Sequence, residues 1–150
     1  MVPDNTTLFT INASYQSLVT LFEKMNDITS EKKDTIISGD WGKLTEIVSS
    51  QNELKIHLEK EEHTIASLGG NSISDQKISI QKNRIKQLIK QYREAETINI
   101  RLLKDSLYLA KLKANKIFKI PFDDETYSPV HTKKNEAIGR SGPIMFDQLI

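Results

Sequence analysis

The sequence predicts an all-α protein, an elongated antiparallel three-helix bundle made of a helical hairpin and a long third helix, with a flexible C-terminal tail. Proline is confined to four positions, which are Pro3, Pro121, Pro129 and Pro143. No proline therefore interrupts a helix between the first two. Within that interval glycines mark two breaks, and apolar residues recur at spacings of three and four. We expect a helical domain over residues 1–120 and a separate tail over residues 121–150.

The first helix is predicted over residues 12–38. Its apolar stripe consists of Leu18, Phe22, Met25, Ile28 or Thr29, and Ile36. Gly39 suits the left-handed position that follows a helix end, and Asp40 can cap the next helix. This short connection predicts two antiparallel neighbours. Trp41 is expected to pack over the end of the bundle.

The second helix is predicted over residues 41–68, where an alternation of three and four holds for more than three heptads. The positions of this seam are Leu44, Ile47, Gln51, Leu54, Leu58, Glu61, Ile65 and Leu68. Two of them, Gln51 and Glu61, are polar. One interpretation is that they are buried and set helix register or partner choice at a cost in stability. The other is that they lie at the solvent-exposed edge of a three-helix seam.

The third helix is predicted over residues 72–120, with Ser72 and Asp75 resembling a capping box at its start. Its apolar positions are Ile78, Ile85, Leu88, Tyr92, Ala95, Leu102, Leu103, Leu107, Ala110 and Ile117. The stripe thins over residues 94–99, near Thr97 and Asn99, which predicts a bend or a register shift there.

The tail begins at Pro121, where helical periodicity stops and turn-forming residues and mixed charge take over. Its end is nevertheless apolar, with Ile144, Met145, Phe146, Leu149 and Ile150. An apolar end on a flexible segment predicts a recognition element that orders on contact, with a short helix as one interpretation of the bound form.

Composition argues against most kinds of chemistry. The chain has no cysteine, and its three histidines do not form a ligand set, because His57 and His63 are six residues apart and His131 is in the tail. We therefore predict no metal, no cofactor, no small-molecule substrate and no enzymatic activity. Residues 1–70 carry 6 basic and 11 acidic side chains, and residues 71–120 carry 12 and 4. These charges are expected to pair between helices, so nucleic-acid binding is not predicted.

The N-terminus shows no basic segment followed by an apolar one, and no stretch has the roughly 18 apolar residues needed to cross a bilayer. A cytoplasmic protein is therefore expected. Together, the helical body, the apolar tail end and the lack of catalytic motifs predict a non-catalytic module that binds other proteins.

Residues 18–62 are similar to the FlgN family of flagellar export chaperones. The shared features are Glu31 in the first helix, the Gly39-Asp40 turn, and Leu44, Gln51, Leu54 and Leu58 in the second helix. Asn99 with Leu102 and Leu103 resembles the middle of that family's third helix, and Glu125-Thr126-Tyr127 resembles the threonine-tyrosine that follows its bundle. Here Ser128 and Pro129 follow instead of the family's early glycine.

The resemblance implies a cytoplasmic chaperone for hook-associated proteins, which form the hook-filament junction. Such a chaperone binds their C-terminal helical regions, prevents premature polymerisation and delivers them to the membrane protein of the flagellar type III export gate. On this hypothesis Ile117 and the five apolar residues of the tail end bind the client, Tyr127 docks on the export gate, and Glu31, Gln51 and Asn99 set helix register.

Two other functions remain open from the sequence. The chain could be a coiled-coil spacer or assembly subunit whose polar seam residues set an oligomer, although a monomer or weak dimer is expected for a chaperone. It could also be a regulator that sequesters another protein, because the apolar surface that would bind a client could equally bind a sequestered protein.

Overall fold

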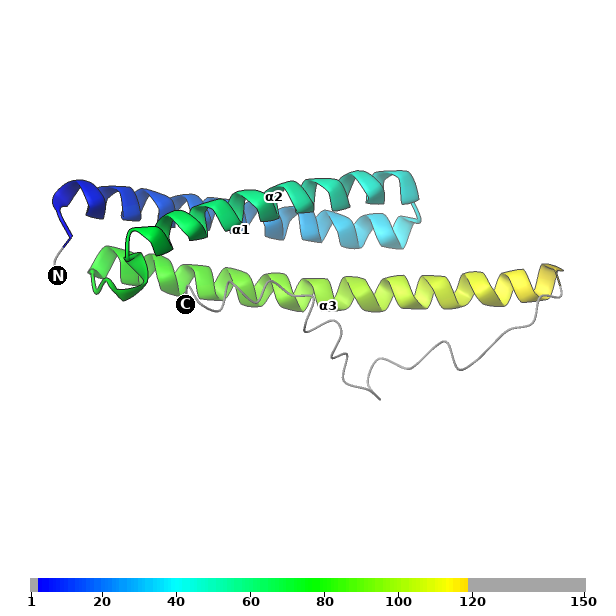
Figure 1. Cartoon of the computed structure of the whole chain (residues 1–150). Helices are drawn as coiled ribbons and strands as arrows, with labels where there is room; N and C mark the ends of the chain where they lie inside the picture. Colours follow the sequence, from blue (N-terminus) through cyan, green and yellow to red (C-terminus); the bar gives the residue numbers. More distant parts are fainter. Residues whose placement is uncertain (1–2, 119–150) are drawn as a thin grey trace.

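The computed structural model describes residues 3–118, which form an all-α three-helix bundle (Figure 1). The helices are α1 (Asn5–Ser38), α2 (Trp41–Ser67) and α3 (Gln76–Phe118), and a short 3₁₀ turn, η1 (Gly70–Ser72), precedes α3. The predicted tail, including Tyr127 and the apolar end at residues 144–150, lies outside the described residues. None of the helices in residues 3–118 is long and apolar enough to cross a membrane.

Helix α1 begins seven residues earlier than the sequence pattern predicted, at Asn5 instead of residue 12. The carboxylate of Asp4 accepts a hydrogen bond of 2.7 Å from the amide of Thr7, which caps the helix. Ile11 and Tyr15 are then fully buried, so the apolar stripe extends further toward the N-terminus than the prediction recognised.

The predicted turn between α1 and α2 is confirmed. Gly39 has a left-handed backbone with φ of 76°, and its amide bonds back to the last turn of α1. Asp40 caps α2 by accepting a bond of 3.1 Å from the amide of Lys43. The two helices consequently run antiparallel. Trp41, which was predicted to pack over the end of the bundle, is about half exposed.

The connection from α2 to α3 corrects the predicted capping box. Ser72 belongs to the 3₁₀ turn, and its hydroxyl donates to the carbonyl of Gly69 at 3.1 Å. Asp75 is the residue that caps α3, because its carboxylate accepts from the amides of Lys77 and Ile78 at 2.9 and 3.3 Å. The third helix therefore begins at Gln76, and it is continuous through the predicted bend region.

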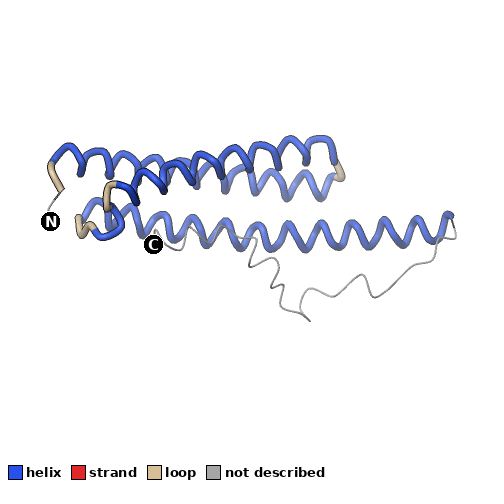
Figure 2. The backbone as a smooth tube through the Cα atoms, viewed as in Figure 1, coloured by secondary structure: helices blue, strands red, loops and turns tan. Residues whose placement is uncertain are grey.

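Helix α1 packs along both α2 and α3, and the three long helices run alongside one another (Figure 2). The core side chains come from all three helices and are Ile11, Tyr15, Leu18, Phe22, Met25, Leu58, Ile65, Ile78, Ile85, Leu88, Ile89 and Tyr92. In α1 these residues alternate at spacings of four and three, and in α2 and α3 they likewise lie on one face of the helix. Burial of one stripe on each helix therefore holds the bundle together.

Helix α3 extends beyond the turn that joins α1 and α2 (Figure 1). It runs parallel to α1, and the two are held level where Lys32 pairs with Glu96. From those residues α1 continues for 6 residues to Ser38, whereas α3 continues for 22 residues to Phe118. The difference of 16 residues corresponds to about 24 Å of helix. We call this part of α3, residues 103–118, the overhang.

Candidate functional site

A buried polar cluster joins the three helices near the closed end of the hairpin. Its centre is Gln51, only 4% exposed, whose amide nitrogen donates to Oε1 of Glu96 at 2.7 Å and to Oγ1 of Thr29 at 3.0 Å. Its amide oxygen accepts from Nζ of Lys32 at 3.0 Å. Both donors and the acceptor of this amide are therefore paired, as burial of a polar group requires.

An ion pair between α1 and α3 completes the cluster. Nζ of Lys32 lies 3.1 Å from both carboxylate oxygens of Glu96, and both side chains are largely shielded from solvent. Burial, and secondarily the negative charge of Glu96, raises the pKa of Tyr92 to about 12. Tyr92 therefore stays neutral beside the ion pair at any physiological pH.

Asn99 lies on the other side of Thr29. Its amide nitrogen donates to the backbone carbonyl of Thr29 at 3.0 Å, and the hydroxyl of Thr29 donates to the carbonyl of Met25 at 2.7 Å. Asn99 is fully buried, and its Oδ1 has no hydrogen-bond partner among the described residues. These contacts of the cluster form only when α1 and α3 have one particular axial position relative to each other. That dependence is the property of a register-setting contact.

The three residues proposed to set register have different positions. Gln51 and Asn99 both contact Thr29, whereas Glu31 lies outside the cluster. The side chain of Glu31 is half exposed and pairs with Lys43 at 3.0 Å across the hairpin turn. A surface pair of this kind contributes little to register.

Lys32 and Glu96 were not predicted to belong to this cluster. Glu96 lies three residues before Asn99 and four after Tyr92, so it continues the apolar stripe of α3 at seam spacing. That spacing was the available signal for Glu96. Lys32 gave the same signal, because it lies three residues after Thr29 and four before Ile36 on the stripe of α1. Its charge nevertheless indicated a solvent-exposed position.

A second buried carboxylate lies on α2, at Glu62. The predicted polar seam position was Glu61, which instead is half-buried and accepts a bond of 3.2 Å from the hydroxyl of Ser17. Glu62 is buried, and its Oε2 has no hydrogen-bond partner among the described residues. Burial, and to a smaller extent the charge of Glu59, raises the pKa of Glu62 to about 7.

The overhang presents apolar side chains that the hairpin does not cover. Ile117, which was predicted to contact a client, is 70% exposed, and Leu107 is 58% exposed. Leu109, Leu112 and Phe118 are also exposed. Large apolar side chains gathered on one end of a helix are typical of a surface that binds another protein.

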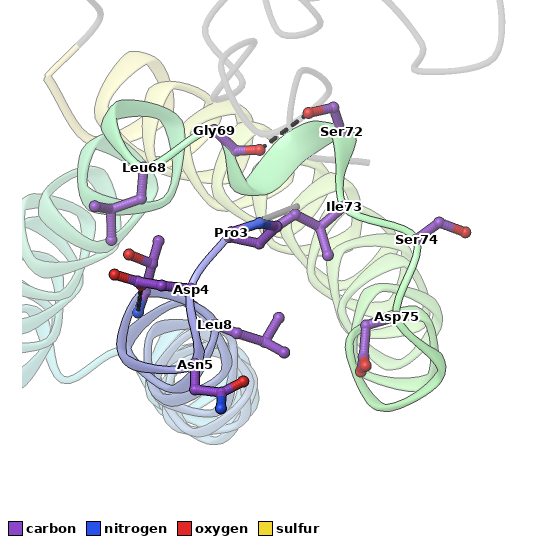
Figure 3. Close-up of a pocket in the computed structure, with 11 residues that line it drawn as sticks. Pro3, Asp4, Asn5, Leu8, Leu68, Gly69, Ser72, Ile73, Ser74 and Asp75 are labelled. Carbon is purple, nitrogen blue, oxygen red and sulfur yellow. Dashed lines mark hydrogen bonds between the residues drawn. The ribbon is translucent and has the colours of Figure 1, made fainter. Parts of the chain in front are cut away.

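The opposite end of the bundle contains a shallow pocket of about 910 Å³ between the starts of α1 and α3 (Figure 3). Its two carboxylates, Asp4 and Asp75, each cap the helix that they precede. Leu8, Leu68 and Ile73 supply much of the apolar lining. Because both acids already accept backbone hydrogen bonds, they do not form a pair aimed at a common ligand.

Within residues 3–118 no three of the histidine, aspartate and glutamate side chains gather closely enough to hold a metal ion. His57 and His63 are both exposed on α2. The other residues proposed to bind partners, namely Tyr127, Ile144, Met145, Phe146, Leu149 and Ile150, lie outside the described residues.

Comparisons with family models, curated proteins and solved structures return no match for this chain. The class that the fold and the site define is an elongated three-helix protein, with an internal polar cluster that joins all three helices and an apolar overhang on its third helix.

Proposed function

We propose that this chain is a cytoplasmic export chaperone, which holds the C-terminal helical regions of hook-associated flagellar proteins and delivers them to the type III export gate. The observation that carries the proposal is the overhang of α3, where apolar side chains at helical spacing have no helix of the hairpin against them. A client whose terminal helices polymerise through apolar stripes needs a partner with a complementary stripe until export.

The proposal assigns separate tasks to the parts of the chain. The core and the buried polar cluster hold α3 rigid and in register, so that the overhang is presented as a formed helix and loses little entropy on binding. Ile117 and the apolar residues of the tail end contact the client. Tyr127, which follows the bundle by a few residues, docks on the export gate.

The test is co-purification of the full chain with the C-terminal segments of hook-associated proteins. Ile117→Asp is expected to reduce client binding at least tenfold, because it places a charge in the apolar contact. Ile80→Asp is the matched control, since Ile80 is 62% exposed on the same helix but far from the overhang. Equal binding by both variants would refute the proposal for the overhang.

A second candidate function, a coiled-coil assembly subunit, rests on the same exposed stripe, which could pair with another copy of the chain. Light scattering separates the two. A stable oligomer that Ile117→Asp dissociates, together with no affinity for flagellar client segments, would favour the assembly subunit. A sequestering regulator would bind a non-flagellar protein through this surface.

A further inference from the structure

One side of the overhang continues the face with which α3 packs on α1. Inside the bundle this face carries Tyr92 and Asn99, which are both buried, and Asn99 bonds to α1. Beyond the hairpin the spacing of four and three continues in five residues, which we call the overhang stripe: Leu103, Leu107, Ala110, Ala114 and Ile117. Leu107 is 58% exposed and Ile117 is 70% exposed. The stripe therefore has the pattern of a packed face but no helix of the hairpin against it.

The opposite side of the overhang has a different character. Leu109 and Leu112 are exposed there, at about 120° and 180° around the helix from the middle of the stripe. They share that side with the charged residues Asp105 and Lys116. Single apolar side chains among charged ones are ordinary on a protein surface. Only the overhang stripe is therefore a continuous apolar face.

The chain itself carries a second apolar segment within reach of this stripe. Five of the seven residues 144–150 are apolar, and Met145, Phe146, Leu149 and Ile150 have the spacing that would place them on one face of a two-turn helix. The 25 residues 119–143 join this segment to α3 and can span at most about 90 Å. The centre of the stripe is only about 12 Å back along α3 from its last residue. The segment can therefore reach every part of the stripe.

We propose that residues 144–150 bind the overhang stripe in the chain without a client, and that a client takes their place. This inference rests on the proposed function and adds the regulation of its client surface. Ala110 and Ala114 are small, so a short apolar segment can approach the backbone of α3 closely between Leu107 and Ile117. Once displaced, the segment is free to contact the client, as the proposed function requires.

The covalent connection favours this segment over a second copy of the chain. A tethered segment meets the stripe at an effective concentration on the order of millimolar, whereas a second copy at micromolar concentration is about a thousandfold more dilute. The same tether regulates the client. Its apparent affinity is lowered by the fraction of chains whose stripe is covered, so only a segment that binds the stripe well displaces residues 144–150.

Paired cysteines test the contact, because the chain has no cysteine of its own. Ala110→Cys with Met145→Cys places one thiol on the stripe and the other in the segment. The control, Leu112→Cys with Met145→Cys, moves the first thiol by two residues and about 160° around α3. In oxidised glutathione the intramolecular disulfide should form about tenfold faster in the first variant, because the bond requires Cβ atoms about 4 Å apart. Non-reducing electrophoresis measures both rates, and equal rates would overturn the inference.

Further substitutions in the first variant test whether apolar contact holds the segment. Phe146→Asp should lower the rate to that of the control pair, because it places a charge in the apolar contact. Ile80→Asp is the matched control, since Ile80 is 62% exposed on α3 but far from the overhang, and it should leave the rate unchanged. A rate that Phe146→Asp does not change would overturn the inference. So would a single Ala110→Cys variant that links two chains as fast, because a second copy would then cover the stripe.

Client binding distinguishes this inference from the proposed function. Oxidation of the variant with Ala110→Cys and Met145→Cys should weaken binding of flagellar client segments about tenfold, and reduction should restore it. Undiminished client binding by the oxidised protein would overturn the inference. If the first pair links faster and no flagellar segment binds either form, the inference stands and the proposed function fails. If Ile117→Asp abolishes client binding while the two cysteine pairs link at equal rates, the inference fails and the proposed function stands.

Discussion

The amide nitrogen of Gln51 in α2 donates a hydrogen bond of 2.7 Å to Oε1 of Glu96 in α3. Helices α2 and α3 mainly pack against α1 and much less against each other. This bond, together with Lys32 in α1, therefore fixes the axial position of all three helices at one level. Sliding any helix by one turn would leave an amide or a charge buried without a partner.

Replacing Lys32 by methionine should destabilise the protein by about 3 kcal/mol, because the carboxylate of Glu96 would remain in the cluster without its countercharge. The triple variant Lys32→Met, Gln51→Leu and Glu96→Leu should recover most of that loss. Apolar residues of similar volume often replace a buried pair at little cost, and removing Gln51 avoids leaving its buried amide without those two partners. Urea unfolding followed by circular dichroism measures both values. If Lys32→Met were as stable as the parent, the ion pair between Lys32 and Glu96 would have to be effectively solvated.

Some residues of this cluster are predictable from the sequence and others are not. Gln51 was recognisable because it interrupts a regular seam, and Gly39 with Asp40 fixed the turn that makes α1 and α2 antiparallel. Both signals are local. Lys32 also fits the stripe of α1, three residues after Thr29 and four before Ile36, but a lysine on a helix is ordinarily solvent-exposed. Its partners Gln51 and Glu96 lie on the other two helices, so the local sequence does not reveal them.

The confusion of Glu61 with Glu62 has a geometric cause. A repeat that alternates three and four averages 3.5 residues per turn, whereas an α-helix has 3.6, so the predicted stripe drifts by about 20° for each heptad. Between Leu58 and Ile65, Glu61 and Glu62 fit the spacing of three and four equally well. On a helix of 3.6 residues per turn, however, Glu62 lies about 20° from Gln51 and Glu61 about 80°. Helical geometry therefore favours Glu62, which a strict alternation of three and four does not distinguish.

Glu62 predicts a pH-dependent stability. Its pKa is raised to about 7 in the folded protein from an ordinary value of 4.5, so the folded state holds the proton more tightly. Stability is therefore lost as pH rises from about 4.5 through 7, and the ionised form costs at most on the order of 3 kcal/mol. Glu62→Gln should be more stable than the parent at pH 8 and nearly equal to it at pH 4.

The measurement is urea unfolding of both proteins at several pH values. The control is Glu61→Gln, which removes a half-buried neighbouring carboxylate hydrogen-bonded to Ser17. That variant retains Glu62, so it should lose stability with rising pH as the parent does. A Glu62→Gln protein whose advantage is the same at both pH values would show that Glu62 ionises as easily in the folded chain as in the unfolded one.

Gly70 is predicted to be intolerant of a side chain. A Cβ atom there would lie 2.7 Å from Cγ2 of Ile65 and 3.1 Å from Cγ2 of Ile11, both in the core. Gly70→Ala should therefore cost about 1 to 3 kcal/mol through overpacking. Gly42→Ala should instead stabilise by about 0.5 kcal/mol, because Gly42 is helical and its nearest neighbour would be Asp40 Oδ1 at 3.8 Å. Thermal unfolding of the two variants should shift in opposite directions.

The proposed division between client and gate predicts two separable losses. Truncation after Ile120 removes the apolar end at residues 144–150 and Tyr127 together, so it should weaken binding of both the client and the gate protein.

Tyr127→Ala should keep client binding and weaken gate binding, because an aromatic residue outside the client surface is the proposed docking contact. Pull-downs with each partner, using Phe9→Ala as a control at an exposed aromatic residue of α1 far from the overhang, measure both effects. Undiminished client binding by the truncated chain would place the client on α3 alone, and loss of the client in Tyr127→Ala would reverse the two roles.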